Sequence, residues 1–92
     1  MTIIVTGHAG FIGFHTARRL LERGESVIGI DNVNSYYDTN LKENRLKVLE
    51  KTARTSNGKY LSVRENLSNK DVLFDVFATH TPDQVINLAA QA

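Results

Sequence analysis

The first thirteen residues constrain the fold more than any other part of the chain. An apolar run from Ile3 to Val5 is followed at once by three glycines, Gly7, Gly10 and Gly13. An amphipathic helical pattern begins directly afterwards. A strand, a glycine turn and a helix in this order can cradle a dinucleotide pyrophosphate, because the free N–H groups of the helix N-terminus face the anion. The stretch therefore predicts a phosphate-binding βα unit, the alternative being a generic βαβ unit whose glycines serve only turn and packing.

The second apolar run ends in an acidic residue. Val27 to Ile30 is followed by Asp31, eighteen positions past Gly13, near the separation expected for a carboxylate that holds the adenosine ribose hydroxyls. A carboxylate there repels a 2′-phosphate and no arginine follows it directly, so the sequence favours NAD over NADP. The alternative is a plain turn or cap residue.

Composition narrows the class of protein. The chain has 92 residues, which allows one domain at most, and its 11 basic and 10 acidic residues nearly balance. An electrostatic case for nucleic-acid binding is therefore absent. There is no cysteine, no apolar run of the length of a membrane span, and no charged segment before the first apolar run. A soluble cytoplasmic protein is the expectation.

The remaining periodicity predicts an α/β fold of the Rossmann type. Strands are expected at 2–6, 26–30, 59–64 and 85–88, and helices from the glycines to about Arg23, from Leu41 to about Thr55, and after a cap at Ser68 or Asn69. Crossover connections then give a parallel sheet in the order 3-2-1-4 with helices on both faces. The alternating strand 59–64 should lie at the sheet edge, and the apolar strand 85–88 should be central.

Individual side chains carry weaker signals. His8 could touch phosphate, although a loop residue acting only through its backbone is the favoured interpretation. The charges on the second helix, Lys42 and Arg45 among them, are read as a solvated face. Tyr36 and Tyr37 could shield an adenosine, meet a partner or anchor a loop. The third helix should bury Val72, Leu73, Val76 and Phe77.

Three segments together carry a resemblance to a known family. They are Thr6–Gly13 (TGHAGFIG), Asp31-Asn32 and Asn87–Gln91 (NLAAQ). They resemble the extended short-chain dehydrogenase/reductase superfamily, in its sugar-nucleotide epimerase and dehydratase branch. The segment Asp31–Asp38 (DNVNSYYD), with Leu41-Lys42 and Arg45-Leu46 behind it, is similar to the UDP-glucuronate 4-epimerases. The resemblance covers all 92 residues.

The resemblance implies NAD as cofactor and a set of binding residues. The pyrophosphate would be held by Gly7, Gly10 and Gly13, with backbone contacts from Phe11 and Ile12. The adenosine side would be held by Asp31, Asn32, Asn34 and Ser35. At the adenine, Asn66 and Leu67 match an Asp-Leu or Asp-Ile pair, and the asparagine in place of aspartate implies weaker binding. The segment passing under the cofactor would be Leu88, Ala89, Ala90 and Gln91.

The resemblance also implies where the chemistry lies. In such enzymes NAD takes a hydride from C4 of a UDP-sugar, here UDP-glucuronate, and returns it to the opposite face, while a Tyr-x-x-x-Lys pair moves the proton. Tyr36, Tyr37 and Tyr60 are followed at that spacing by Asn40, Leu41 and Arg64, so no catalytic residue is expected within the 92.

Family members are several times longer, so the chain is expected to be the N-terminal part of an NAD-binding Rossmann domain. The alternatives are a free-standing NAD-binding module without catalysis and an interaction protein. Because the expected fourth strand leaves a sheet edge unpaired and exposes apolar side chains, self-association or pairing with the missing half is expected.

Overall fold

The computed structural model describes residues 1–32, 39–65 and 68–88. Along the chain the elements are β1 (Thr2–Thr6), α1 (Phe11–Glu22), β2 (Ser26–Ile30), α2 (Thr39–Ser56), β3 (Lys59–Val63), α3 (Lys70–His80) and β4 (Gln84–Asn87). Each strand and helix expected from the sequence is present, and the predicted ends differ from the observed ones by at most two residues. The elements could be predicted because short β-branched runs alternate with longer segments of helical periodicity along the chain.

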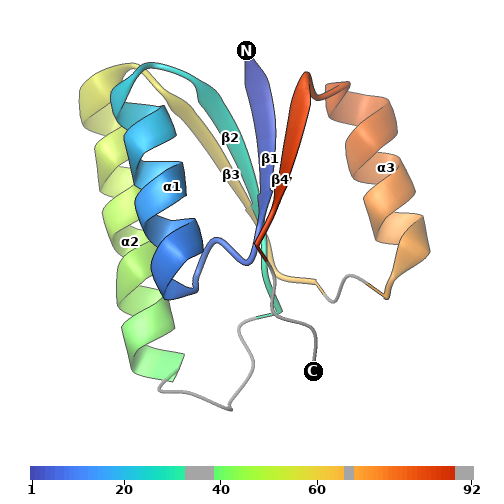
Figure 1. Ribbon diagram of the computed structural model, residues 1–92, viewed down its shortest axis with the longest axis horizontal. Coiled ribbons are helices and arrows are strands. Elements are labelled where there is room, and N and C mark those ends of the chain that lie inside the picture. Colours follow the sequence, from blue (N-terminus) through green and yellow to red (C-terminus); the bar gives the residue numbers. More distant parts are fainter. Residues whose placement is uncertain (33–38, 66–67, 89–92) are drawn as a thin grey trace.

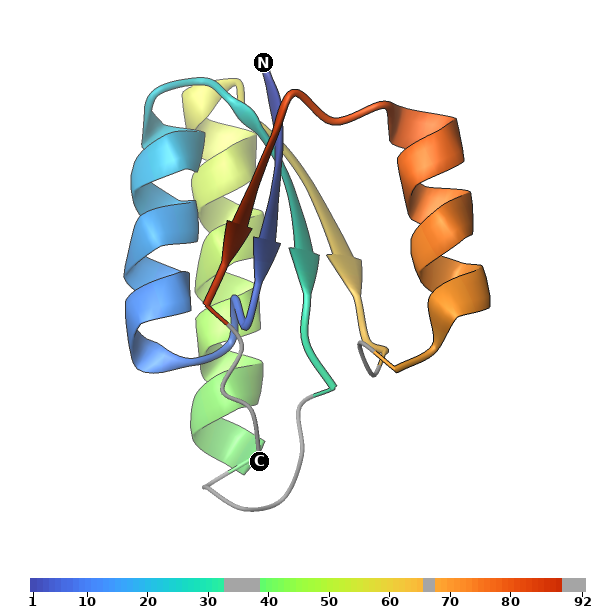
Figure 2. The ribbon, with the colours of Figure 1, turned by 45° about the vertical axis from the view of Figure 1, so that its right-hand side comes forward.

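The four strands form one parallel sheet in the order β3-β2-β1-β4. In register, Thr6 lies beside Ile30 of β2 and beside Asn87 of β4, so the carboxyl ends of these strands meet at one edge. Figures 1 and 2 show α1 and α2 covering one face of the sheet and α3 covering the other. The predicted Rossmann-type topology is confirmed.

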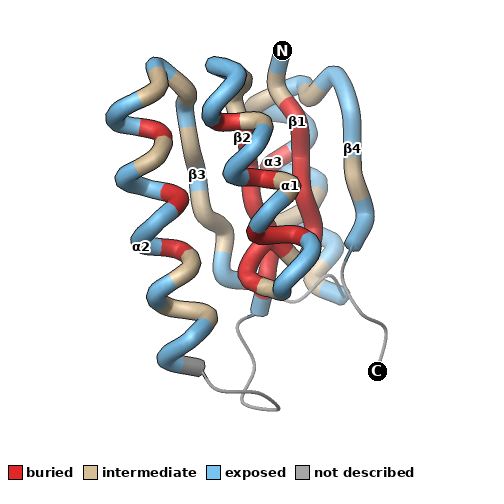
Figure 3. The backbone as a smooth tube through the Cα atoms, turned by 60° about the vertical axis from the view of Figure 1, so that its left-hand side comes forward, coloured by how far each residue is buried: buried red, intermediate tan, exposed pale blue. Residues whose placement is uncertain are grey.

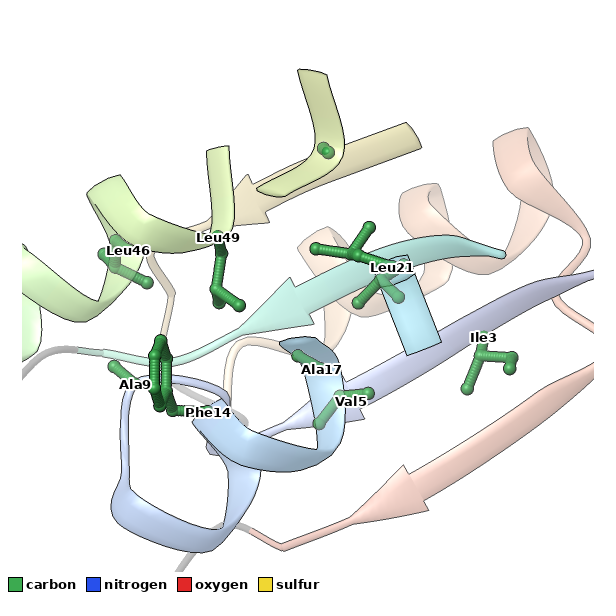
Figure 4. Packing of buried hydrophobic residues seen from close by; sticks show 10 residues of the cluster. Ile3, Val5, Ala9, Phe14, Ala17, Leu21, Leu46 and Leu49 are labelled. Carbon is green, nitrogen blue, oxygen red and sulfur yellow. The ribbon is translucent and has the colours of Figure 1, made fainter. Parts of the chain in front are cut away.

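Two apolar clusters hold the layers together. The larger one lies between the sheet and α1 and α2, and Figure 4 shows it built from β1, both helices and the glycine loop. Its members are Ile3, Val5, Ala9, Phe14, Ala17, Leu21, Val27, Leu46, Leu49 and Ala53. The smaller one joins Ile4, Ile28 and Ile30 to Val76 of α3. Each fully buried large aliphatic side chain contributes about 1.5–3 kcal/mol.

Burial falls away toward β4 and α3, and two expectations fail there. β4 is the edge strand opposite β3, and Figure 3 shows it largely exposed beside the buried β1. Val85 is 49% exposed, as expected for the unpaired edge, but in the described sheet β4 does not take the central position that its apolar sequence favoured. Phe77 is 43% exposed, because α3 meets the sheet chiefly through Val76, with Val72 and Leu73 packed beside it.

Within the described ranges, no helix is both long and apolar enough to cross a membrane.

Candidate functional site

The turn between β1 and α1 is closed so tightly that two of its positions depend on glycine. Gly7 has a φ of 74°, a conformation that side chains with a Cβ rarely adopt. Its N–H donates to the Ile30 carbonyl at 2.7 Å, and its own carbonyl accepts from Gly10 at 3.0 Å. A Cβ on Gly13 would stand 2.0 Å from the Gly7 carbonyl oxygen. The first turn of α1 therefore rests directly on the backbone of the turn that precedes it.

The N-terminus of α1 carries no cap from a side chain. Gly10, its N-cap residue, has no side chain that could accept from the helix, and the first turn contains no acidic residue. The first backbone N–H groups of a helix lack intrahelical acceptors, and they carry a partial positive charge. Phe11 and Ile12, in this first turn, are 66% and 65% exposed. The end of α1 nearest the carboxyl edge of the sheet is thus an open, positively polarised set of donors.

Asp31 lies buried beside this turn and holds it. One carboxylate oxygen accepts from the Ala9 N–H at 3.1 Å, and the other lies 3.7 Å from the Lys42 ammonium nitrogen. The Ala9 carbonyl accepts from Arg45 at 3.0 Å, and the Arg45 guanidinium lies 5.9 Å from the centre of the Phe11 ring. The interpretation of Lys42 and Arg45 as part of a solvated face was therefore wrong, because the start of α2 lies against the glycine turn.

His8 is the clearest departure from the sequence interpretation. Its side chain is fully buried, and its Nε2 lies 3.0 Å from the Tyr60 hydroxyl and 3.2 Å from the Ser62 hydroxyl. The favoured view of a residue acting only through its backbone was wrong. The other interpretation was a contact with phosphate. In the structure the His8 side chain contacts side chains of β3. The imidazole lies across β2, where a Cβ on Gly29 would stand 2.2 Å from its ring.

Burial shifts the protonation equilibria of this group. Loss of solvation lowers the pKa of His8 from 6.5 to about 4, against a smaller opposing effect of the Asp31 charge. Burial likewise raises the pKa of Tyr60 to about 12. The imidazole is therefore neutral at physiological pH. The ring and the hydroxyls of Tyr60 and Ser62 form a hydrogen-bonded group within the core.

A signal for this contact was present in the sequence. Gly29 interrupts an otherwise apolar strand, and a glycine inside a strand often marks the close approach of another group. Tyr60 and Ser62 share one face of the alternating strand β3. No local pattern, however, indicates that His8 reaches across β2 to meet them.

The end of β4 is fastened to the end of β1. The Leu88 N–H donates to the Thr6 carbonyl and lies 3.1 Å from the Thr6 hydroxyl oxygen, and that hydroxyl also pairs with the Asn87 side chain. Leu88 thus lies beside the glycine turn, as expected. Asn32 is exposed next to Asp31. Seven expected site residues lie outside the described residues: Asn34, Ser35, Asn66, Leu67, Ala89, Ala90 and Gln91. Tyr36 and Tyr37 also lie outside them.

The described residues fit an anionic dinucleotide better than a metal ion. A Cβ at Gly13 would collide with the Gly7 carbonyl, the N-cap residue of α1 provides no side-chain cap, and a carboxylate lies beside this turn. No group of three metal-ligating side chains occurs in the described part of the chain. A shallow hollow on α1, lined by residues from His15 to Glu22, includes none of the expected site residues.

The chain is similar to known proteins in both sequence and structure. Residues 4–92 match the family described as GDP-mannose 4,6 dehydratase. The chain is 47% identical to Protein CapI of Staphylococcus aureus and 41% identical to a probable UDP-glucuronate 4-epimerase of Rhizobium meliloti, in both cases over all of its length and 26% of theirs. It therefore spans about a quarter of the length of these relatives.

A solved structure agrees with the sequence comparison. The UDP-glucose 4-epimerase of Bifidobacterium longum, in complex with NAD+ and UDP, superposes with a TM-score of 0.75 at 28% identity. The alignment covers 99% of this chain and 25% of that one.

Proposed function

Because this chain belongs to the family described as GDP-mannose 4,6 dehydratase, we propose that it forms the NAD-binding portion of a nucleotide-sugar epimerase. In the complete enzyme the reaction is epimerisation at C4 of a UDP-sugar, with UDP-glucuronate as the favoured substrate. The similarity to a probable UDP-glucuronate 4-epimerase and to an epimerase solved with NAD+ supports this assignment. The 92 residues alone are not catalytic in this proposal.

The contact between Gly13 and Gly7 carries the proposal. A Cβ at Gly13 would stand 2.0 Å from the Gly7 carbonyl oxygen, so only glycine allows α1 to begin where it does. That placement directs an uncapped helix N-terminus along the carboxyl edge, next to the buried carboxylate of Asp31. An anion and a ribose diol are the ligand groups that suit those two features.

Each group has a defined task in this proposal. Backbone N–H groups at Gly10, Phe11 and Ile12 bind the pyrophosphate oxygens, and Asp31 accepts from the ribose hydroxyls. The adenosine side is completed by Asn32, Asn34, Ser35, Asn66 and Leu67, and the floor beneath the cofactor by Leu88, Ala89, Ala90 and Gln91. When bound, NAD supplies the hydride acceptor and donor for the epimerisation.

Calorimetric titration of the purified chain with NAD+, with NADP+ as control, tests the proposal. We expect a Kd at or below about 100 μM, roughly −5.5 kcal/mol, for NAD+, and a much weaker Kd for NADP+. No binding of either dinucleotide would contradict a working half-site in this chain. No turnover of UDP-glucuronate is expected with or without NAD+.

The exposed side chains of β4 support a second candidate function, self-association or pairing with the remainder of a longer protein. Val85 on β4 is 49% exposed and Leu88, which directly follows β4, is 38% exposed. In the sheet of the described residues β4 is an edge strand, and such an edge can pair with another strand. We expect a concentration-dependent dimer in light scattering. A monodisperse monomer at high concentration would contradict self-association, and Val85→Lys is expected to shift any dimer toward monomer.

A further inference from the structure

Asp31 is paired with a lysine that its sequence position did not suggest. The Lys42 ammonium nitrogen lies 3.7 Å from one Asp31 oxygen, and the two side chains are only 11% and 7% exposed. Lys42 reaches this site from the first turns of α2, eleven positions along the chain. Because little water screens such a pair, its Coulomb interaction is stronger than that of a surface pair. The charge of the carboxylate is thus balanced at short range.

The neighbouring cations have other partners. Arg45 donates to the Ala9 carbonyl at 3.0 Å, and Arg64 forms a two-pronged ion pair with Glu43. Among the described residues at this edge, Lys42 is therefore the cation whose ionic partner is Asp31 itself. Removing the charge at position 31 therefore leaves the Lys42 ammonium without this ionic partner.

We propose that Lys42, together with Asp31, determines the choice between NAD+ and NADP+, an inference that rests on the dinucleotide site proposed above. NADP+ carries an additional phosphate on the 2′-oxygen of the adenosine ribose. The Asp31 carboxylate disfavours that dianion, and the Lys42 ammonium beside it favours it. The intact pair partly cancels its own selectivity, and an uncharged residue at position 31 leaves a lysine ready to accept the phosphate.

A double-mutant cycle measured by calorimetry tests this division of roles. The proteins are the wild type, Asp31→Asn, Lys42→Met and the double variant, each titrated with NAD+ and NADP+. Asparagine keeps an oxygen that can accept from the Ala9 N–H, and methionine keeps most of the apolar stem of lysine. Lys47→Met, an exposed change on the same helix, is the matched control.

We expect Asp31→Asn to improve the NADP+ affinity relative to NAD+ by at least tenfold, and the double variant to lose most of that gain. Lys42→Met alone should widen the preference for NAD+. Lys42→Arg in the Asp31→Asn background keeps the charge and should retain the gain, which separates charge from loss of fold. The NADP+ affinity of Asp31→Asn should also fall more steeply with salt than that of the double variant.

The outcomes separate this inference from the proposed function. If the wild type binds NAD+ but the Asp31→Asn gain is absent, or persists without a charge at position 42, the role of Lys42 is overturned while the NAD site stands. If Lys42 were only structural, Lys42→Met would weaken the binding of NAD+ and of NADP+ equally. If the wild type binds neither dinucleotide, the proposed function fails and this inference fails with it.

Discussion

The N-termini of α1 and α3 differ in how their free backbone N–H groups are treated. α3 is capped by its own neighbourhood: the Asn69 side chain accepts from the Val72 N–H, it donates to Glu65 at 3.1 Å, and Asp71 lies in the first turn. α1 has neither a side-chain cap nor an acid in its first turn. Its geometry is instead fixed by the turn that precedes it, where Asp31 and Arg45 contact the Ala9 backbone and the His8 side chain contacts β3.

The two helix ends show what an uncapped N-terminus requires of the surrounding structure. A helix whose first donors are satisfied locally gains stability and has little to offer an anion. A helix end left open needs its position secured by residues that do not occupy the donors. The contacts around Gly7–Gly13 come from β2, α2 and β3, and they all lie beside or behind the open end.

The largest expected effect comes from filling the α1 contact. Gly13→Ala places a Cβ against a backbone oxygen that cannot move aside, and we expect it to lower the free energy of unfolding by at least about 3 kcal/mol and to abolish NAD+ binding. Urea unfolding and calorimetry measure the two effects. Gly10→Ala, whose Cβ would lie 3.3 Å from the same oxygen, is the milder comparison. A Gly13→Ala protein with wild-type stability would refute the tight contact.

The buried His8 should make stability depend on pH. Its pKa falls from 6.5 to about 4 in the folded chain, so between these values the unfolded chain binds a proton that the folded chain does not. The contribution of His8 to the free energy of unfolding is fully present above pH 6.5 and is lost as the pH falls toward 4. The total loss is about 3 kcal/mol, and it does not grow further below about pH 4. Urea unfolding of the wild type and of His8→Asn across this range isolates it. Parallel pH profiles would contradict the assignment.

Because His8 packs over Gly29, substitutions at the two positions should have non-additive effects on stability. Gly29→Ala introduces a Cβ 2.2 Å from the His8 ring and should cost about 2 kcal/mol. In a His8→Ala background the ring is gone, and the same change should cost at least about 1 kcal/mol less. Additive effects in the double-mutant cycle would show that the ring and Gly29 do not meet. Ser26→Ala, on the same strand, serves as a control.

At α3 the effect should be local. Asn69→Ala removes the side-chain acceptor for the Val72 N–H, and we expect a loss of about 1 kcal/mol in stability with NAD+ affinity unchanged. Asn69→Ser, which can still cap, should recover most of the loss. A matching drop in NAD+ affinity would mean that the two helix ends are not independent.

The smallest change converts the end of α1 toward that of α3. Ile12→Glu places a carboxylate in the first turn of α1 at an exposed position, so it should stabilise the fold by about 0.3–1 kcal/mol. The same charge should weaken NAD+ by repulsion from the pyrophosphate. Ile12→Gln, without the charge, should leave both quantities close to the wild type. Unchanged NAD+ affinity in Ile12→Glu would indicate that the pyrophosphate does not lie at this helix end.

The helices and strands could be predicted from the sequence, because each depends on residues close together in the chain, and the crossover rules then predicted the strand order. The cap of α3 was left between Ser68 and Asn69, and the structure shows that it is Asn69. The spacing of Gly7, Gly10 and Gly13 and the place of Asp31 after its strand follow from the same local rules. Burial on α3 was harder to predict, since Phe77 is an apolar residue whose exposure depends on which neighbours pack against it.

The contacts that support the N-terminus of α1 could be seen only in the folded chain. His8 meets Tyr60 and Ser62 across more than fifty positions, and Lys42 meets Asp31 across eleven. Neither pairing has a periodic signature, because a contact between elements depends on how the helices and strands pack and not on the pattern within any one of them. The sequence therefore marked the residues proposed to contact a dinucleotide, and the packing between elements determined which residues hold the glycine turn in place.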